Sequence, residues 1–365
     1  MKKKRLAVIG GGAHTIPSYR AMLKRIAHKY EVILFSEFHL DRKSEVEEYS
    51  IRSVSEKKRN ARWRTVAFFI LIIKSFYSQR PDLIHSHSTY PSGVVAIILG
   101  WLFRIPVVVC LDAAEASAVP EIQFGDLLHK RRMQWNKWVM KNAAAVTALT
   151  RFQCDDVRVN SDFSKPIQII PRGVDLARYM PTDKAPIAAP VRFLSVAYLH
   201  PVKDHDTLLR AFQMISHHVE ASLTIVGQDY SNGRMQQLAK ELGIQERVDF
   251  TGFVPHENIA GYYKQADILL HTALFESQAM AVVEAMACGV LVCGTRVGIM
   301  ADLSGECCVT VTTKEYATLA DEVVRLINSP AEQIRLRANA RNWVETHSLS
   351  WTTQQYLNLY EQVIK

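Results

Sequence analysis

The sequence predicts an α/β protein made of two doubly wound domains, each with a parallel sheet, that face each other across a cleft. At 365 residues the chain is too long for one compact core. Short runs rich in Val, Ile and Leu alternate with amphipathic helical stretches throughout, which is typical of parallel sheets built from βαβ units. The alternation stops once, at PTDKAPIAAP (residues 181–190), whose three prolines indicate a linker.

The first predicted domain spans residues 1–180. Its expected strands are RLAVIG, EVILFS, DLIHSH, PVVVCL, AAVTAL and IQIIP. The amphipathic segment PSYRAMLKRIAHK lies between the first two strands, and its Pro17 suits a first helical turn.

The second predicted domain spans residues 191–349. Its expected strands are VRFLSVA, SLTIVG, VDFTG, DILLHT, VLVCG and CCVTV. Helices are expected near 314–328, 331–346 and 350–364, and we expect the last one to pack back on the first domain. Ligands of such sheets bind at the carboxyl ends of the strands, so function is expected in the loops that follow them.

Composition excludes several classes of protein. The longest apolar runs, residues 66–73 and 93–103, are shorter than the ~20 residues that span a bilayer. The opening MKKKRLAVIGGGA has too short an apolar part for a signal peptide and is interpreted as a first strand. The six cysteines form no CxxC pair, which favours buried free thiols in a reducing cytoplasm over disulfides or zinc.

The net charge of +8 is unevenly distributed. Residues 1–190 have a balance of +13, and residues 191–365 have a balance of −5. Basic clusters are interleaved with tryptophan at 57–64 and 129–141. Two interpretations remain open: ordinary solvated helix faces, or a surface for anionic lipid headgroups or an acidic acceptor. Nucleic acid is not expected as a partner, because no recognition motif accompanies the charge.

The first loop, IGGGAHTIP, follows a predicted strand. Its glycines allow close backbone approach to a ligand, and we assign Gly11, Gly12 and His14 to the side of the cleft that faces an acceptor. The dinucleotide fingerprint GxGxxG requires a glycine where the chain has Thr15, so an NAD-dependent oxidoreductase is not favoured.

The segment FESQAMAVVEAMACG (275–289) places two acids, Glu276 and Glu284, eight positions apart among small and apolar residues. The same stretch of chain carries GFVPHENIAGYYKQADILL just upstream. With that context, residues 223–298 resemble retaining glycosyltransferases of family 4, which have the GT-B fold of two Rossmann-like domains. The resemblance extends more weakly over nearly the whole chain.

The resemblance implies roles for the residues that match the family motif. Glu276 would lie in a loop before a helix and accept hydrogen bonds from the transferred sugar, and Glu284 would accept them from the ribose. Lys203 would neutralise the diphosphate of a nucleotide-sugar. The remaining donor-side residues are Gly227 at a strand end, Phe253 and Val254 near the base, and Ala279, Met280, Ala281 and Val282, whose backbone would face the diphosphate.

Three positions depart from the family pattern. Tyr198 stands where the family has an arginine, and tyrosine carries no positive charge. Asp112 stands where the family has a histidine near the donor sugar; a role on a sugar hydroxyl is open, although a carboxylate near a leaving diphosphate is electrostatically poor. Arg172 is a candidate to supply the missing charge.

His85 and His87 resemble the His-x-His at the end of the family's third strand. Two interpretations are open for them: a role toward acceptor or donor sugar in the cleft, or hydrogen-bonded structural histidines at a strand end. No spacing of histidines and carboxylates indicates a metal site, and the resemblance implies none.

The leading hypothesis is a retaining, metal-independent glycosyltransferase of the hexosyltransferase type. It would need no cofactor, would use a nucleotide-diphosphate sugar, and would act on a glycan, glycolipid or small molecule. Surface polysaccharide or glycolipid assembly, in the cytoplasm or at the inner face of a membrane, fits the basic first domain. The alternatives are a degenerate relative that binds nucleotide or glycan with little transfer, and a nucleotide-sugar epimerase of similar fold.

Overall fold

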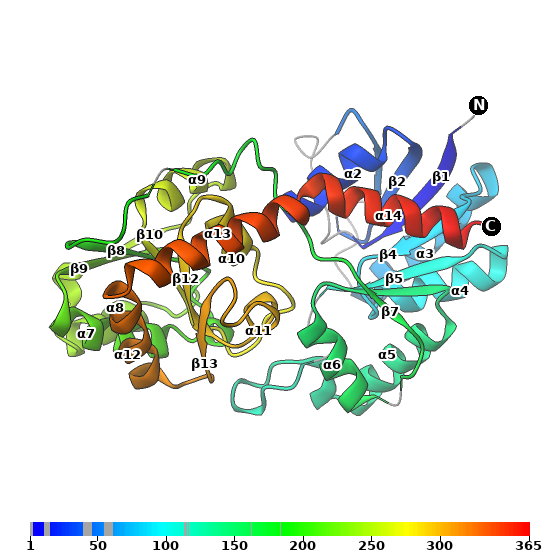
Figure 1. Cartoon of the computed structure of the whole chain (residues 1–365). Coiled ribbons are helices and arrows are strands. Elements are labelled where there is room, and N and C mark those ends of the chain that lie inside the picture. The colour runs from blue at the N-terminus through cyan, green and yellow to red at the C-terminus, as the bar shows by residue number, and fades with distance from the viewer. Residues whose placement is uncertain are drawn as a thin grey trace.

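The protein forms two α/β domains side by side, each built on one parallel sheet (Figure 1). This computed structural model describes residues 3–10, 15–38, 46–54, 61–112, 115, 117–161, 163–182 and 184–365. No helix within these ranges is long and apolar enough to cross a membrane.

The first sheet has the strand order β3-β2-β1-β4-β5-β6-β7, and neighbouring strands run parallel. Its strands are β1 (Lys4–Ile9), β2 (Tyr30–Ser36), β3 (Ser50–Ser53), β4 (Leu83–Ser86), β5 (Val107–Leu111), β6 (Ala145–Ala148) and β7 (Ile167–Ile169). The edge strand β3 was not among the strands expected from sequence. Its four residues, SIRS, contain one apolar side chain, so no alternating or apolar run marks it.

Helices cover both faces of the first sheet. Their bounds are α2 (Pro17–Ile26), α3 (Ala61–Ser78), α4 (Ser92–Phe103), α5 (Lys130–Asn142) and α6 (Arg151–Asn160). Side chains of α3 to α6 share one apolar cluster with the sheet, whereas α2 packs on the opposite face. Pro17 is the first residue of α2, where its missing N–H costs no helical hydrogen bond.

The second sheet has the strand order β10-β9-β8-β11-β12-β13, again parallel. Its strands are β8 (Val191–Val196), β9 (Ala221–Val226), β10 (Val248–Gly252), β11 (Ile268–His271), β12 (Leu291–Thr295) and β13 (Val309–Val311). The apolar run of each strand is buried because helices cover both faces.

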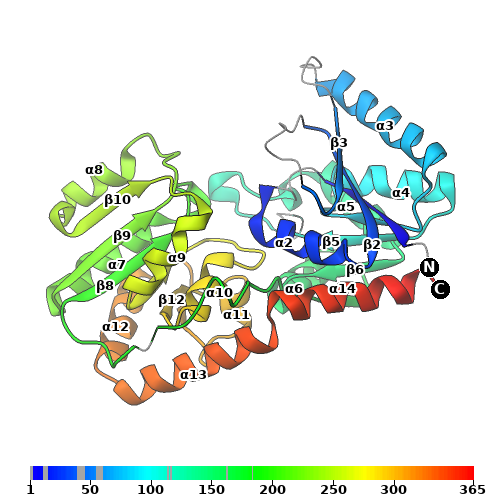
Figure 2. The same cartoon turned by 90° about the horizontal axis from the view of Figure 1, so that it is seen from above.

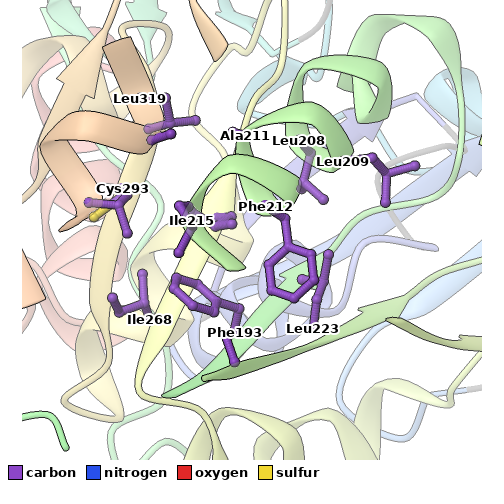
Figure 3. Packing of buried hydrophobic residues seen from close by; sticks show 14 of the residues in the cluster. Phe193, Leu208, Leu209, Ala211, Phe212, Ile215, Leu223, Ile268, Cys293 and Leu319 are labelled. Carbon is purple, nitrogen blue, oxygen red and sulfur yellow. The ribbon is translucent and has the colours of Figure 1, made fainter. Parts of the chain in front are cut away.

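The helices of the second part of the chain are α7 (His205–His218), α8 (Arg234–Glu241), α9 (His256–Gln265), α10 (Met280–Ala287), α11 (Ile299–Asp302), α12 (Tyr316–Ile327), α13 (Pro330–Thr346) and α14 (Leu349–Val363). On one face of the sheet, Phe212 of α7 lies edge-on to Phe193 of β8, with ring centroids 5.8 Å apart (Figure 3). This close packing fixes the start of α7, and with it the loop that follows β8.

The last helix, α14, leaves the second domain and lies along the first one (Figure 2). It packs beside α2, and Tyr360 is fully buried there. The chain therefore crosses between the domains twice, once near residues 171–190 and once between α13 and α14.

Candidate functional site

The strand order of each sheet reverses direction at one point, and loops diverge from the carboxyl ends of the strands there. In the second sheet this point lies between β8 and β11. Ligands of open α/β sheets bind at such a switch point. The loop after β8 carries Lys203 and the loop after β11 carries Glu276, so the two predicted side chains meet at this position although 73 residues separate them.

Glu276 is the centre of a compact charged cluster. Its Oε1 lies 2.5 Å from Nζ of Lys203 and 3.0 Å from Nε2 of His271, the last residue of β11. Burial alone would raise the pKa of Glu276, but Lys203 and His271 outweigh it and lower the pKa to about 2. The carboxylate is therefore charged at neutral pH and acts only as a hydrogen-bond acceptor.

The turn between Glu276 and α10 separates the two acids of the motif. Ala279 has a positive φ of 76° and precedes the first residue of α10. Gly298 approaches this turn so closely that a Cβ on it would lie 2.8 Å from Cβ of Glu276. Glu276 thus lies in a loop and Glu284 on the helix, as the resemblance implied, and the first N–H groups of α10 point out of the helix start between them.

Glu284 is buried and its two oxygens have different partners. Tyr263 donates its hydroxyl to Oε2 at 2.9 Å, and Nε2 of His256 lies 3.1 Å from Oε1. The hydroxyl of Tyr179 in turn lies 3.0 Å from Nε2 of His256. Burial and the neighbouring Glu284 raise the pKa of Tyr263, which keeps its hydroxyl protonated as a donor. Each carboxylate oxygen still has capacity for a further donor.

Tyr198 is exposed beside the charged cluster. Nζ of Lys203 lies 5.3 Å from the centroid of its ring, within the range of a cation–π contact. Next to it, a cavity of about 330 Å³ opens between the domains, lined by Glu121 and Ile122 of the first and by Leu199, His200 and Tyr230, among others, of the second. The ring of Tyr198 therefore contacts Lys203 of the cluster on one side and lies 6.0 Å from the ring of Tyr230, which lines the cavity.

The other predicted donor-side residues lie on neighbouring loops. Phe253 is exposed after β10, and Val254 follows it half-buried. Gly227 directly follows β9, and a Cβ on it would lie 2.1 Å from the carbonyl oxygen of Ala197. Only glycine allows the loops after β8 and β9 to approach this closely.

A second charged cluster belongs to the first domain. The carboxylate of Asp112, directly after β5, is hydrogen-bonded to the guanidinium of Arg172, and Nε2 of His87 lies 2.6 Å from its Oδ2. Burial alone would raise the pKa of Asp112, but Arg172 and His87 hold it below its usual value. The carboxylate of Asp112 therefore has a basic side chain beside each of its two oxygens, Arg172 at Oδ1 and His87 at Oδ2.

Arg172 cannot supply the positive charge that Tyr198 lacks, and this expectation is corrected. Its guanidinium is buried against Asp112 and lies over the ring of Tyr19. Its backbone is fixed as well: N donates to Oε1 of Gln278 at 2.8 Å, and Nε2 of Gln278 donates to its carbonyl oxygen at 2.7 Å. Arg172 therefore joins the first domain to the turn that carries Glu276.

His85 does not face the cleft, which corrects the first of its two interpretations. It is fully buried, with Nδ1 2.6 Å from the hydroxyl of Tyr360 in α14, and burial followed by the neighbouring His87 lowers its pKa to about 3. The ring of His85 is therefore enclosed by side chains of the last helix, α14. Gly11, Gly12 and His14 lie outside the described residues.

Three residues of the site were missed in the sequence: His271, His256 and Gln278. The sequence position of His271 could have indicated a role, because it ends the strand that leads into the motif with Glu276 and Glu284. His256 and Gln278 stand within quoted motif segments, but nothing local indicates that they contact Glu284 and Arg172. Among the described residues, no group of three His, Cys, Asp or Glu side chains could hold a metal ion.

Two family models match this chain. The model for glycosyl transferases group 1 matches residues 183–343, and the model for glycosyltransferase family 4 matches residues 9–178. A D-inositol 3-phosphate glycosyltransferase of Corynebacterium jeikeium is 28% identical over 305 residues, which are 77% of this chain and 72% of the relative. An N-acetyl-alpha-D-glucosaminyl L-malate synthase of Bacillus anthracis is 23% identical over 297 residues, 78% of this chain and 75% of the relative.

Solved structures share the fold over the whole chain. The sucrose-phosphate synthase of Thermosynechococcus elongatus superposes with a TM-score of 0.83 at 19% identity, covering 99% of both chains. Anabaena HepE in complex with UDP and glucose superposes with a TM-score of 0.80 at 19% identity, covering 99% of this chain and 100% of that one.

Proposed function

The chain belongs to the glycosyltransferases of family 4, with the GT-B fold, and on this premise we propose that it is a retaining, metal-independent enzyme that uses a nucleotide-diphosphate sugar. One observation carries the proposal. Lys203 and Glu276 meet at the switch point of the second sheet, and Glu284 follows on α10. The ammonium group of Lys203 and the carboxylates of Glu276 and Glu284, both hydrogen-bond acceptors, thereby line one edge of the sheet.

Each group suits one part of such a donor. Lys203 has three N–H donors and spends one on Glu276, so the others are available to a diphosphate. Glu276 accepts hydrogen bonds from sugar hydroxyls, and Glu284 accepts them from the ribose. The N-terminus of α10 adds N–H groups and a favourable dipole for the phosphates, and the backbone near Phe253 contacts the base.

Retention is proposed because the carboxylates that approach this site are poor bases. With a pKa of about 2, Glu276 holds a proton too weakly to remove one from an acceptor hydroxyl, and Asp112 is likewise held in its charged form. We propose that the glycosidic C–O bond breaks first and its electron pair goes to the diphosphate oxygen, stabilised by Lys203. The acceptor hydroxyl then bonds to the anomeric carbon on the same face and gives its proton to that oxygen.

The acceptor is proposed to be a glycan, a glycolipid or a small polar molecule, bound toward the first domain in the interdomain cavity. The role in surface polysaccharide or glycolipid assembly at the inner face of a membrane is part of this proposal. It is supported by the excess of positive charge in residues 1–190. The known relatives differ in acceptor, so their names select none for this chain.

The test is the thermal stability of the full chain with UDP, GDP, ADP or NAD. One nucleoside diphosphate is expected to stabilise the chain by about 2.7 kcal/mol at ~100 times its Kd. HepE was solved with UDP-glucose, so UDP comes first. Glu284→Ala should lose the shift, whereas Glu241→Ala, an exposed acid on α8, should keep it. Stabilisation by NAD alone would overturn the proposal.

Two measurements test retention and metal independence directly. The anomeric configuration of the sugar in the product, followed by proton NMR, should match that of the donor. Turnover should persist in excess EDTA, because the charge at the diphosphate comes from Lys203. An inverted anomeric configuration would contradict retention. A loss of turnover in EDTA that Mg²⁺ or Mn²⁺ restores would contradict metal independence.

A degenerate relative that binds nucleotide with little transfer is the second candidate. Tyr198 favours it, because an uncharged side chain stands beside the proposed diphosphate position. Tyr198→Arg distinguishes the two, with Tyr316→Arg, at an exposed tyrosine on α12, as a control. A gain in donor turnover for Tyr198→Arg alone indicates a weakened enzyme. Binding without turnover in both forms indicates a binding protein.

A further inference from the structure

The outer face of α3 is apolar although it is exposed. Trp63, Val66, Ile70 and Tyr77 follow one another at spacings of 3, 4 and 7 residues, so they form one stripe along the helix. Trp63 is 67% exposed. The opposite side of the helix is buried in the core of the first domain. A surface helix normally has a polar outer face. In α3 the exposed stripe is apolar, as the buried side of the helix is.

The apolar surface continues onto the neighbouring helices. On α4, Ile98, Trp101 and Leu102 are exposed, and Trp101 is edge-on to Trp138 of α5, with centroids 5.2 Å apart. Trp135, also exposed, lies 5.6 Å from Trp138. Both views place α3 and α4 on the side of the first domain that faces away from the second (Figures 1 and 2). We call this surface the α3–α4 face.

Positive charge surrounds the α3–α4 face. Between residues 57 and 111 the only acid is Asp82, and residues 127–154 contain none. Lys130 and Arg131 are exposed at the start of α5, one turn before Trp135, and Lys74 is exposed on α3. Arg132 is exposed beside them but pairs with Asp126 at 3.2 Å. Aromatic and aliphatic side chains beside lysine and arginine are the composition of helices that lie in a membrane interface.

The charge decides between the possible occupants. A second copy of the chain would bring like charges together around an apolar centre, which disfavours a symmetric dimer. An anionic bilayer complements both features, because headgroups attract the basic side chains and the acyl region takes the apolar ones. We propose that this protein docks on an anionic lipid bilayer through the α3–α4 face, with α3 in the plane of the interface.

This docking deepens the proposed role at a membrane face and uses none of the residues of the donor chemistry. The donor residues are on the second domain, and the α3–α4 face is on the far side of the first. A protein that fails to bind nucleotide can therefore still dock, and one that fails to dock can still bind nucleotide, so the two failures are distinguishable.

The test is co-sedimentation of the full chain with sucrose-loaded vesicles of phosphatidylcholine, alone or mixed equally with phosphatidylglycerol. At low salt the partition coefficient should be at least about tenfold higher for the anionic vesicles, and high salt should reduce it. The apolar triple variant Trp63→Gln, Ile70→Gln, Trp101→Gln should lose about tenfold or more in partitioning. The variant Lys74→Gln, Lys130→Gln, Arg131→Gln should lose the preference for anionic lipid.

Val159→Gln with Ile334→Gln is the matched control, since both residues are exposed and apolar on other helices. It should partition like the wild type, and all variants should keep the wild-type unfolding temperature and nucleotide affinity. The proposal is overturned if the wild type ignores anionic vesicles at low salt, or if the apolar variant partitions like the control. It is also overturned if the wild type is a dimer that the apolar variant dissociates.

Discussion

The two domains each bring one carboxylate, one cation and one histidine to the space between them, but the two clusters are built differently. The side chains of Glu276 and Lys203 are 12% and 13% exposed, whereas those of Asp112 and Arg172 are 3% and 8% exposed. Lys203 has three N–H donors and spends one of them on Glu276. Arg172 is held through its guanidinium and through both backbone polar groups.

This difference in exposure indicates that the Glu276 cluster binds a ligand and that the Asp112 cluster stabilises the fold. A ligand site needs charged groups whose hydrogen-bonding capacity is not used up, and the Glu276 cluster meets this condition. A buried ion pair holds geometry instead, and the Asp112 cluster anchors the chain crossing at Arg172 to the turn before α10. Four predictions follow this contrast from the largest expected effect to the smallest.

Removing the cation of the supporting cluster should have the largest effect. Arg172→Met leaves Asp112 buried without its main partner, and breaking a buried pair costs about 3–5 kcal/mol of unfolding free energy. Urea denaturation measures the loss. Arg158→Met is the control, because its pair with Asp155 is exposed and should change stability by about 1 kcal/mol or less. Equal losses for the two would contradict the structural role of Arg172.

Removing the cation of the binding cluster should act on turnover. Lys203→Met is expected to lower kcat/KM by about 10² to 10³, the usual cost of losing one group that stabilises developing charge. Its unfolding free energy should fall less than that of Arg172→Met, because solvent can reach Glu276. Steady-state kinetics with the nucleotide-sugar found in the nucleotide screen checks this, with Lys240→Met on exposed α8 as control. Unchanged kcat/KM would remove Lys203 from the site.

The pH dependence of stability should reveal the charge on Glu276. Its pKa falls from 4.5 to about 2 on folding, so its contribution is full above pH 4.5 and is lost as the pH falls toward 2. The wild type should therefore exceed Glu276→Gln by at most about 3 kcal/mol at pH 6. Urea denaturation between pH 6 and pH 3 should show this difference narrowing below pH 4.5. A difference that is constant with pH would contradict the lowered pKa.

The smallest effect concerns a contact between the domains. Oxygens of Asp302 in α11 accept from the first two backbone N–H groups of α6, those of Arg151 at 2.6 Å and Phe152 at 2.8 Å. Asp302→Ala removes this cap and should cost about 1 kcal/mol of unfolding free energy. Asp302→Asn keeps an acceptor and should cost less. If both variants match the wild type, the cap does not hold the domains together.

Much of the fold could be predicted from local pattern. All twelve strands expected from apolar runs are present, because a strand buried on both faces must be apolar along its length. The edge strand β3 was missed because a strand at the edge, paired among the described strands with β2 alone, needs no such run. The helices near 314–328, 331–346 and 350–364 correspond to α12, α13 and α14. The apolar periodicity is strongest in α12.

The site could be predicted only in part, for a physical reason. The spacing of Glu276 and Glu284 is local, and one turn and one helix place them. The partners of Arg172 and His85 are 60 and 275 residues away in the chain, and no local pattern specifies such pairings. The sequence therefore offered Arg172 as a cleft cation and left two interpretations open for His85, whereas burial in the structure gives both residues structural partners.

The most direct measurement is calorimetric titration of the stabilising nucleoside diphosphate into the wild type, Lys203→Met and Arg172→Met. The account predicts that Lys203→Met weakens binding about tenfold or more, the loss of one charge-assisted hydrogen bond, whereas Arg172→Met keeps the Kd within about twofold at a temperature where it is folded. The opposite ranking, with Lys203→Met binding normally and folded Arg172→Met not binding, would contradict the division between a binding and a supporting cluster.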